Sequence, residues 1–204
     1  MLWNFKTLLS ENGIEPKGII QIGAHHFQEK QDFLEAGIKH FVLIEPQKQA
    51  FEILKQRASD LSDVLLYNIA ISNFNGDDDL ICSDNEGQSS SLLIPSKHTQ
   101  EYPMVLFNRV ERVQVWKLDN ITFDREKYNI LYIDIQGNEL NALKGMPQTL
   151  FWIDAIYTEV NFIELYEKCG LLQDLEKFLA KNNFHRVAIG PEINGWSDAF
   201  YVKK

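Results

Sequence analysis

Acidic side chains occur in this sequence at the ends of short apolar runs, where they could bind hydroxyl groups or move protons. Glu45, Asp134 and Glu159 each close such a run. The runs are rich in β-branched and aromatic residues, which predicts buried strands of a parallel sheet. Because ligands of open α/β sheets bind beyond the carboxyl ends of the strands, we expect the three carboxylates to surround one cleft.

Asp134 and Glu159 are the predicted catalytic pair. Two carboxylates at one cleft are costly unless they bind cations or hydroxyl groups, or act as acid and base. Hydrogen bonds to the backbone are the structural alternative, and a divalent ion between them is left open but no metal site is predicted. His25 is a third candidate proton acceptor, with helix capping or cofactor packing as its alternative role. His25 and His26 are not expected to share a metal, because neighbouring side chains diverge at a helix start.

The stretch Gly18 to His26 predicts a strand, a small-residue turn and the start of a helix. Gly23 would let the backbone approach a nucleotide-like ligand, although it could simply form a tight turn. Glu45 lies 22 positions after Gly23, where nucleotide-binding folds place the acid that binds the ribose hydroxyls. Pro46 ends that strand. Gly23 is the only glycine left of the Gly-x-Gly-x-x-Gly pattern, which argues against a nicotinamide-dependent oxidoreductase.

Strand and helix patterns alternate along the chain, which predicts a doubly wound α/β fold. An antiparallel strand pair is expected at the carboxyl end of the chain. The expected strands lie at 18–22, 41–44, 64–67, 80–82, 110–116, 130–134, 153–159, 184–189 and 196–202. The expected helices lie near 2–9, at 27–36, 47–58 and 138–144, and around 171–179.

Composition limits the number of domains and the classes of partner. A length of 204 residues suits one core, so we expect a single domain over 1–204, with one domain of a longer multidomain chain as the alternative. The net charge of −9 disfavours nucleic acids and anionic membranes as partners. No signal-peptide pattern and no apolar run of transmembrane length are found, so a soluble, cytoplasmic protein is expected. The oligomeric state is not predicted.

Residues 73–120 interrupt the alternating pattern. Asp77–Asp79 is predicted to be a solvated turn, and the polar segment Ser83–Ser91 a loop that covers the acceptor. Four aromatic residues are candidates to line a cleft for a polyhydroxylated ligand, with ordinary core packing as the alternative; they are Tyr102, Trp116, Tyr157 and Trp196.

Several short motifs, in this order and spacing, resemble the FkbM-like family of S-adenosylmethionine-dependent methyltransferases. They are Gln-Ile-Gly-Ala-His at 21–25, Ile44-Glu45-Pro46, Asn68-Ile-Ala-Ile-Ser72, Ser90-Ser-Leu92, Leu118-Asp119, residues 132–140 with Leu143-Lys-Gly145, and Thr158-Glu-Val160. The resemblance implies a class I methyltransferase fold, a Rossmann-like three-layer sandwich with a mostly parallel seven-stranded sheet and a terminal antiparallel strand. It also implies S-adenosyl-L-methionine as cofactor. The candidate cofactor-binding residues are Gln21, Gly23, Ala24, His25, Glu45, Pro46, Asn68, Ile69, Ala70 and Asp134.

Two positions depart from the family pattern, in which an acid usually stands at Gln21 and a glutamate at Gln136. Gln21 adds no negative charge for the ammonium group of the cofactor, so weaker binding or a substitute acid is expected. Acceptors in this family are commonly hydroxyl groups of sugars or natural products. The sequence therefore favours O-methylation of a sugar, with a deoxyhexose such as rhamnose in a glycan as the first choice. A natural-product hydroxyl and a catalytically inactive binding subunit are the alternatives.

Overall fold

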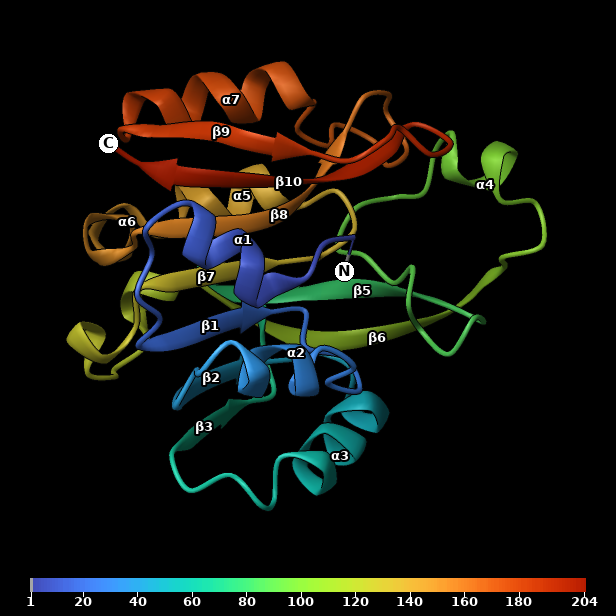
Figure 1. Ribbon diagram of the computed structural model, residues 1–204. Helices are drawn as coiled ribbons and strands as arrows, with labels where there is room; N and C mark the ends of the chain where they lie inside the picture. The colour runs from blue at the N-terminus through green and yellow to red at the C-terminus, as the bar shows by residue number, and fades with distance from the viewer. Residues whose placement is uncertain (1) are drawn as a thin grey trace.

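The computed structural model describes residues 2–204 and contains a mixed sheet of seven strands in the order β3-β2-β1-β7-β8-β10-β9 (Figure 1). Five neighbouring strands of this sheet, β3, β2, β1, β7 and β8, run parallel. Strand β10 is antiparallel to both of its neighbours, β8 and β9. The predicted sheet with a terminal antiparallel strand is thereby confirmed. The strands are β1 (Gly18–Ile22), β2 (His40–Ile44), β3 (Val64–Tyr67), β7 (Ile130–Ile133), β8 (Ala155–Asn161), β9 (Phe184–Ile189) and β10 (Trp196–Lys203).

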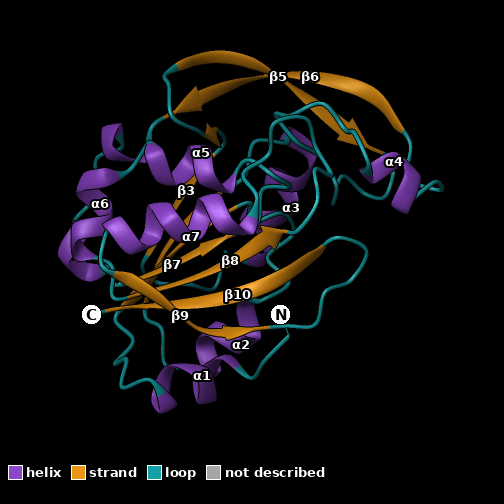
Figure 2. Cartoon of the chain, turned by 90° about the horizontal axis from the view of Figure 1, so that it is seen from above, coloured by secondary structure: helices purple, strands orange, loops and turns teal. Residues whose placement is uncertain are grey.

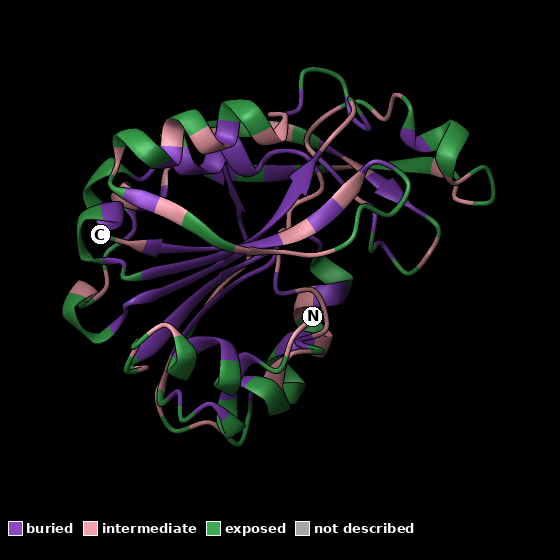
Figure 3. Cartoon of the chain, turned by 45° about the horizontal axis from the view of Figure 1, so that its top comes forward, coloured by how far each residue is buried: buried purple, intermediate pink, exposed green. Residues whose placement is uncertain are grey.

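Helices cover both faces of this sheet and make the expected three-layer sandwich (Figure 2). One face packs against α1 (Phe5–Glu11), α2 (Lys30–Glu35) and α3 (Lys48–Arg57). The other packs against α5 (Glu139–Lys144), α6 (Pro147–Trp152) and α7 (Leu172–Lys181). Figure 3 shows the buried sheet between helices whose outer sides are exposed.

Alternation along β1 explains how one strand serves both cores. Ile20 and Ile22 lie in the core beneath α5–α7, whereas Ile19 lies in the core beneath α1–α3. Successive strand residues point to opposite faces, so Gln21 faces the same side as Ile19. Gln21 pairs in register with Tyr132 of β7, and Asp134 has the same parity as Tyr132. The chain thus directs Gln21 and Asp134 toward the side of α1–α3.

A second sheet, of order β4-β6-β5, lies beyond the layer formed by α5–α7 (Figure 2). Its strands are β4 (Ala70–Ile71), β5 (Gly76–Ser83) and β6 (Phe107–Trp116), and α4 (His98–Glu101) lies between the last two. The prediction of a solvated turn at Asp77–Asp79 is wrong, because these residues belong to β5 and pair with residues 112–114 of β6. The turn precedes them, and Gly76 adopts φ +152. Two short 3₁₀ helices, Leu118–Asn120 and Arg125–Lys127, precede β7.

The first crossover helix is shorter than the sequence predicts. A helix over 27–36 is expected, but α2 spans only Lys30–Glu35. The preceding turn contains His25 at φ +43 and Phe27 at φ +58, values that interrupt a right-handed helix. In residues 2–204, no helix has the length and apolar character needed to cross a bilayer.

Candidate active site

The carboxyl ends of the parallel strands surround a cavity of about 380 Å³. Strand register explains why, because Ile22 of β1 pairs with Ile44 of β2 and with Ile133 of β7, so the three strands end level. The residues that follow these strand ends, Glu45 and Asp134 among them, therefore meet at one edge. The predicted site residues on the cavity wall are Gly23, His25, Glu45, Pro46, Ile69, Ala70, Asp134 and Glu159. Three other predicted site residues, Gln21, Ala24 and Asn68, do not line it.

The backbone conformation of the turn requires a glycine at position 23, whether or not a ligand binds there. Gly23 adopts φ +82, and a Cβ atom at this position would overlap the carbonyl oxygen of Asp134. The amide N–H groups of Gly23 and Ala24 both donate to the carbonyl of Ile44, at 3.0 and 2.9 Å. The turn is thus held against β2 and β7, and Ala24 is fully buried behind the wall.

Glu45 is a buried carboxylate with both oxygens bound to the backbone. Oε2 accepts the N–H of His25 at 2.9 Å, and Oε1 accepts the N–H of Gln47 at 2.8 Å. Its exposed fraction is 2%, and this burial raises its pKa above the ordinary value. Each carboxylate oxygen has a second lone pair, so Glu45 can also accept hydroxyl hydrogen atoms from the cavity.

Apolar side chains next to Glu45 can cover the faces of a flat heterocycle. Ile69, Ala70, Ile71 and Leu80 lie on the wall. Asn68, a predicted cofactor-binding residue, does not line the cavity. Its Nδ2 donates to the carbonyls of Glu45 at 2.8 Å and Pro46 at 2.9 Å, and therefore holds the exit of β2 in place.

Gln136 bridges the two predicted catalytic carboxylates. Its Nε2 donates to Asp134 Oδ1 at 2.8 Å and to Glu159 Oε2 at 3.0 Å (β7 and β8 are neighbours). Its Oε1 lies 3.1 Å from the hydroxyl of Tyr166, so every polar atom of the amide has a partner. Gln136 adopts φ +55, which turns the chain back toward the strand ends. A neutral amide at this position separates two acids that would otherwise repel each other.

Burial and mutual repulsion shift the titration of this pair. Burial raises the pKa of Asp134 to about 6, with further contributions from the charges of Asp198 and Glu29. The pKa of Glu159 is raised above its ordinary value by burial and then by the charge of Asp134. Both carboxylates are therefore easier to protonate than in water, and proton exchange with a bound hydroxyl is feasible near neutral pH.

A third acid, Glu139, shapes the turn between β7 and α5. Its Oε1 accepts the N–H groups of Ile135 at 3.0 Å and Gly137 at 3.1 Å. The side chain is 1% exposed, and burial raises its pKa to about 7. The sequence pattern predicts a helix at 138–144 but assigns no role to Glu139, although an acid early in a helix is a common signal for backbone N–H binding.

His25 lies on the wall with both ring nitrogens occupied. Nε2 is 2.9 Å from the carbonyl of Glu86, and Nδ1 is 2.9 Å from the side-chain nitrogen of Gln28. With both nitrogens engaged, the ring has no free nitrogen to take the proton of a substrate hydroxyl. The geometry therefore favours a positioning role for His25. The expectation that His25 and His26 diverge is wrong, because their rings stack at 3.8 Å between centroids. No group of three or more potential metal ligands is found within residues 2–204.

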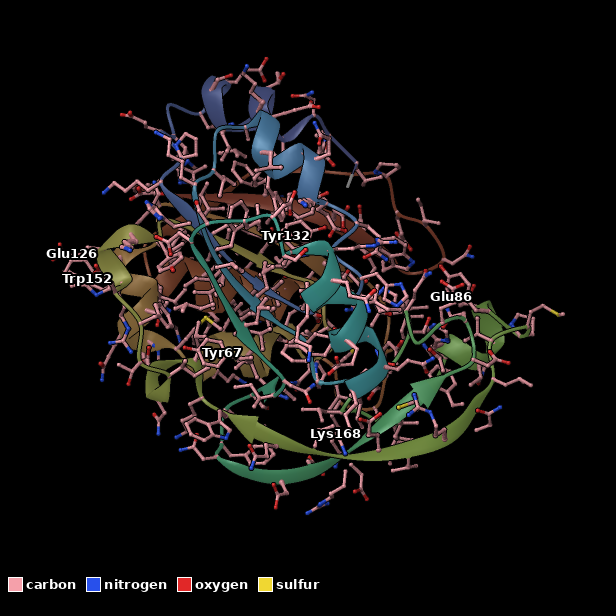
Figure 4. The ribbon with its side chains drawn as sticks, turned by 90° about the horizontal axis from the view of Figure 1, so that it is seen from below. Tyr67, Glu86, Glu126, Tyr132, Trp152 and Lys168 are labelled. Atoms are coloured by element: carbon pink, nitrogen blue, oxygen red, sulfur yellow. The ribbon has the colours of Figure 1, made fainter. Side chains whose placement is uncertain are left out.

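The segment Ser83–Ser91 lies over the cavity and is attached on two sides. Gln47 Nε2 donates to the carbonyl of Gly87 at 3.0 Å, next to Glu45. On the other side, Ser91 Oγ donates to the carbonyl of Gln136 at 2.7 Å. Figure 4 shows Glu86 of this loop at one end of the molecule and Trp152 at the opposite end. That this loop covers the acceptor stays a prediction.

Aromatic side chains form one part of the wall. Trp196 Nε1 donates to the hydroxyl of Tyr102 at 2.7 Å, and His98 packs against Tyr102 with 4.9 Å between ring centroids. The other two aromatic candidates lie elsewhere. Tyr157 is buried in the core, stacked on Tyr132 at 4.8 Å, and Trp116 is exposed outside the cavity. The sequence did not predict that His98 lies on the cavity wall or that Tyr166 contacts Gln136, because no local pattern relates these residues to the strand ends.

Comparison with known proteins agrees with this geometry. The family profile described as the methyltransferase FkbM domain matches residues 21–186. A curated relative, 2-O-methyltransferase NoeI of Sinorhizobium fredii (strain NBRC 101917 / NGR234), is 29% identical over 158 residues. The alignment covers 73% of this chain and 65% of the relative, so the chain spans less than two thirds of the relative's length.

Solved methyltransferase structures share the fold at low sequence identity. A putative S-adenosylmethionine-dependent methyltransferase from Listeria monocytogenes has a TM-score of 0.58 at 10% identity, over 100% of this chain and 94% of that one. Magnesium protoporphyrin IX methyltransferase from Synechocystis PCC 6803, with bound S-adenosylmethionine, has a TM-score of 0.56 at 9% identity, over 98% and 76%. The chain has the class I methyltransferase fold and belongs to the FkbM domain family of S-adenosylmethionine-dependent methyltransferases.

Proposed function

We propose that this protein transfers a methyl group from S-adenosylmethionine to a carbohydrate hydroxyl, with a deoxyhexose such as rhamnose as the first acceptor to test. The observation that carries the proposal is the pair of carboxylates, Asp134 and Glu159, on the wall of one cavity and joined by Gln136. The name of the relative NoeI, a 2-O-methyltransferase, supports a hydroxyl acceptor.

The cofactor fits the residues present. Glu45 offers buried acceptor lone pairs for the ribose hydroxyls, and Ile69 and Ile71 offer an apolar surface for adenine. When bound, the cofactor supplies an electrophilic methyl group on a sulfonium centre. The protein must then align the acceptor oxygen and remove its proton.

Asp134 is the proposed base. Asp134 is partly exposed on the cavity wall, whereas Glu159 is 5% exposed. Asp134 is therefore the member of the pair that an acceptor hydroxyl reaches more easily, and its pKa of about 6 leaves it ionised at neutral pH. It accepts the hydroxyl proton, while Glu159 holds a neighbouring hydroxyl by a hydrogen bond. A vicinal diol, as in a sugar ring, presents two hydroxyls at a spacing that suits such a pair.

The aromatic part of the wall favours a sugar as the acceptor. Tyr102, Trp196 and His98 present apolar ring faces together with polar edges on the same cavity. Rings of this kind pack against the C–H faces of pyranoses while their polar edges bind hydroxyls. The wall carries no lysine or arginine, which disfavours acceptors with carboxylate or phosphate groups.

Methyl transfer from labelled cofactor to a panel of acceptors tests the proposal. The panel comprises glycosides, phenols, small carboxylic acids and short RNAs, and Asp134→Asn is measured beside the wild type. We expect labelled glycosides, and a loss of roughly 100-fold or more in turnover for Asp134→Asn. Activity on RNA or carboxylic acids with none on glycosides would refute the acceptor class. Wild-type turnover by Asp134→Asn would refute the role of that carboxylate, and no binding of the cofactor or its product would favour an inactive subunit.

A further inference from the structure

Gln21 is a buried amide at the end of β1 with an acidic partner. Its Nε2 donates to Glu29 Oε2 at 2.9 Å, and the side chain is 1% exposed. Its Oε1 has no hydrogen-bond partner within residues 2–204. An amide buried in this way fixes the position of the carboxylate that it contacts.

We propose that Glu29 carries the negative charge that binds the ammonium group of the cofactor, and that Gln21 positions Glu29 for this task. This inference rests on the proposed function. Glu29 lies on the cavity wall with Gly23 and Asp134, whereas Gln21 does not reach the cavity. The negative charge that the family pattern places at position 21 on β1 is, in this proposal, carried by Glu29, eight positions later.

The turn between β1 and α2 explains how Glu29 reaches the strand end. His25 and Phe27 adopt positive φ values of +43 and +58, which fold the chain back on itself. Phe27 is 2% exposed and packs against Phe33 and Phe41, so the turn is anchored in the core. Glu29 then directly precedes α2 and faces Gln21. A non-glycine residue at positive φ costs free energy, and such conformations cluster at ligand sites.

Glu29 has no cationic side-chain partner in the part of the chain that the structure describes. Among residues 2–204, no lysine, arginine or histidine nitrogen lies within 4 Å of its carboxylate. The adjacent Lys30 contacts Asp60 and the carbonyl of Arg57 instead. A carboxylate on a cavity wall with no cationic partner from the protein can bind a ligand cation.

The charge of the whole wall agrees with a cationic ligand. Its ionisable carboxylates are Glu29, Glu45, Asp134 and Glu159, and it includes no lysine or arginine. The other three already have tasks, because Glu45 is bound by two backbone N–H groups and Gln136 bridges Asp134 and Glu159. Glu29 is the remaining acid, and within residues 2–204 its carboxylate has one hydrogen-bond partner, the amide of Gln21.

Calorimetric binding tests the proposal without any acceptor. S-Adenosylhomocysteine and its analogue lacking the amino group are titrated into the wild type, Glu29→Gln and the exchanged pair Gln21→Glu/Glu29→Gln. We expect Glu29→Gln to weaken binding of S-adenosylhomocysteine about tenfold or more and to leave the deaminated analogue unchanged. The exchanged pair, which moves the carboxylate to a position that does not reach the cavity, should recover little of the affinity.

Controls separate binding from folding and from the proposed function. Glu35→Gln changes an exposed acid of α2, the helix that Glu29 precedes, and should bind both ligands as the wild type does. Thermal melts without ligand should show that every variant folds. Unchanged affinity in Glu29→Gln would overturn the inference while leaving the methyltransferase proposal intact. Equal losses for both ligands, or full recovery of the affinity in the exchanged pair, would also overturn it. Failure of the wild type to bind either ligand would instead overturn the proposed function.

Discussion

Replacing Glu45 tests the cofactor site independently of any acceptor. The carboxylate is 2% exposed and accepts two backbone N–H groups on different oxygens, from His25 at 2.9 Å and from Gln47 at 2.8 Å. Its remaining lone pairs face the position proposed for the ribose. Glu45→Ala removes a charged acceptor, which typically contributes roughly 1.5–3 kcal/mol. We expect binding of S-adenosylhomocysteine to weaken roughly 10- to 150-fold.

Glu45→Ala also leaves two backbone donors without their partner, so stability must be measured beside affinity. Each unsatisfied N–H costs roughly 1–3 kcal/mol where water cannot reach it. Glu45→Gln is the matched variant. Its amide oxygen can accept only one of the two backbone N–H groups, and its NH₂ group then faces the other N–H, donor against donor. We expect Glu45→Gln to lose affinity and stability, but less of each than Glu45→Ala.

A ligand without ribose hydroxyls shows whether the lost affinity comes from the contact between Glu45 and those hydroxyls. Calorimetry with S-adenosylhomocysteine and its 2′,3′-dideoxy analogue forms a thermodynamic cycle with the wild type and Glu45→Ala. The dideoxy analogue should bind the wild type weakly and should lose little more in the variant. Wild-type affinity of Glu45→Ala for S-adenosylhomocysteine would refute the reasoning from position and spacing. Equal losses for both ligands would show that Glu45 acts only by holding the backbone.

Three further predictions concern the acids and the aromatic wall. Asp134 must be deprotonated to act as the base, so kcat/KM should fall roughly tenfold per pH unit below its pKa of about 6, measured with the best acceptor. Glu139 has its pKa raised from 4.5 to about 7, so the folded state binds its proton more tightly and loses stability as pH rises through that window. Glu139→Gln keeps the accepting oxygen and should gain about 3 kcal/mol over the wild type at pH 8 and little at pH 4.5, by urea unfolding. A variant that matches the wild type at both pH values would contradict the raised pKa. Trp196→Phe removes the 2.7 Å bond to Tyr102 and should raise the acceptor KM about fivefold with unchanged cofactor affinity, and altered cofactor affinity would place these rings on the wrong ligand.

The sequence by itself determined the strands and the residues at their ends. Short β-branched runs predict buried parallel strands, and the residue after each run necessarily lies at the carboxyl edge of the sheet. This local rule identified Gly23, Glu45, Asp134 and Glu159 as neighbours, and the structure places all four on one cavity wall. The prediction that Glu159 ends its strand is wrong, because β8 continues to Asn161. The same rule did not predict that Asp77–Asp79 belong to a strand, because three consecutive acids show no alternation of apolar and polar residues.

Only the tertiary structure decided what each polar side chain contacts. The partner of Gln21 depends on positive φ values at His25 and Phe27, and non-glycine residues give no sequence signal for such values. Tyr166 reaches Gln136 across thirty positions, through the packing of a loop that no local pattern specifies. A side-chain hydrogen bond is decided by differences of less than an ångström in the placement of whole elements, whereas a strand is decided by its own residues.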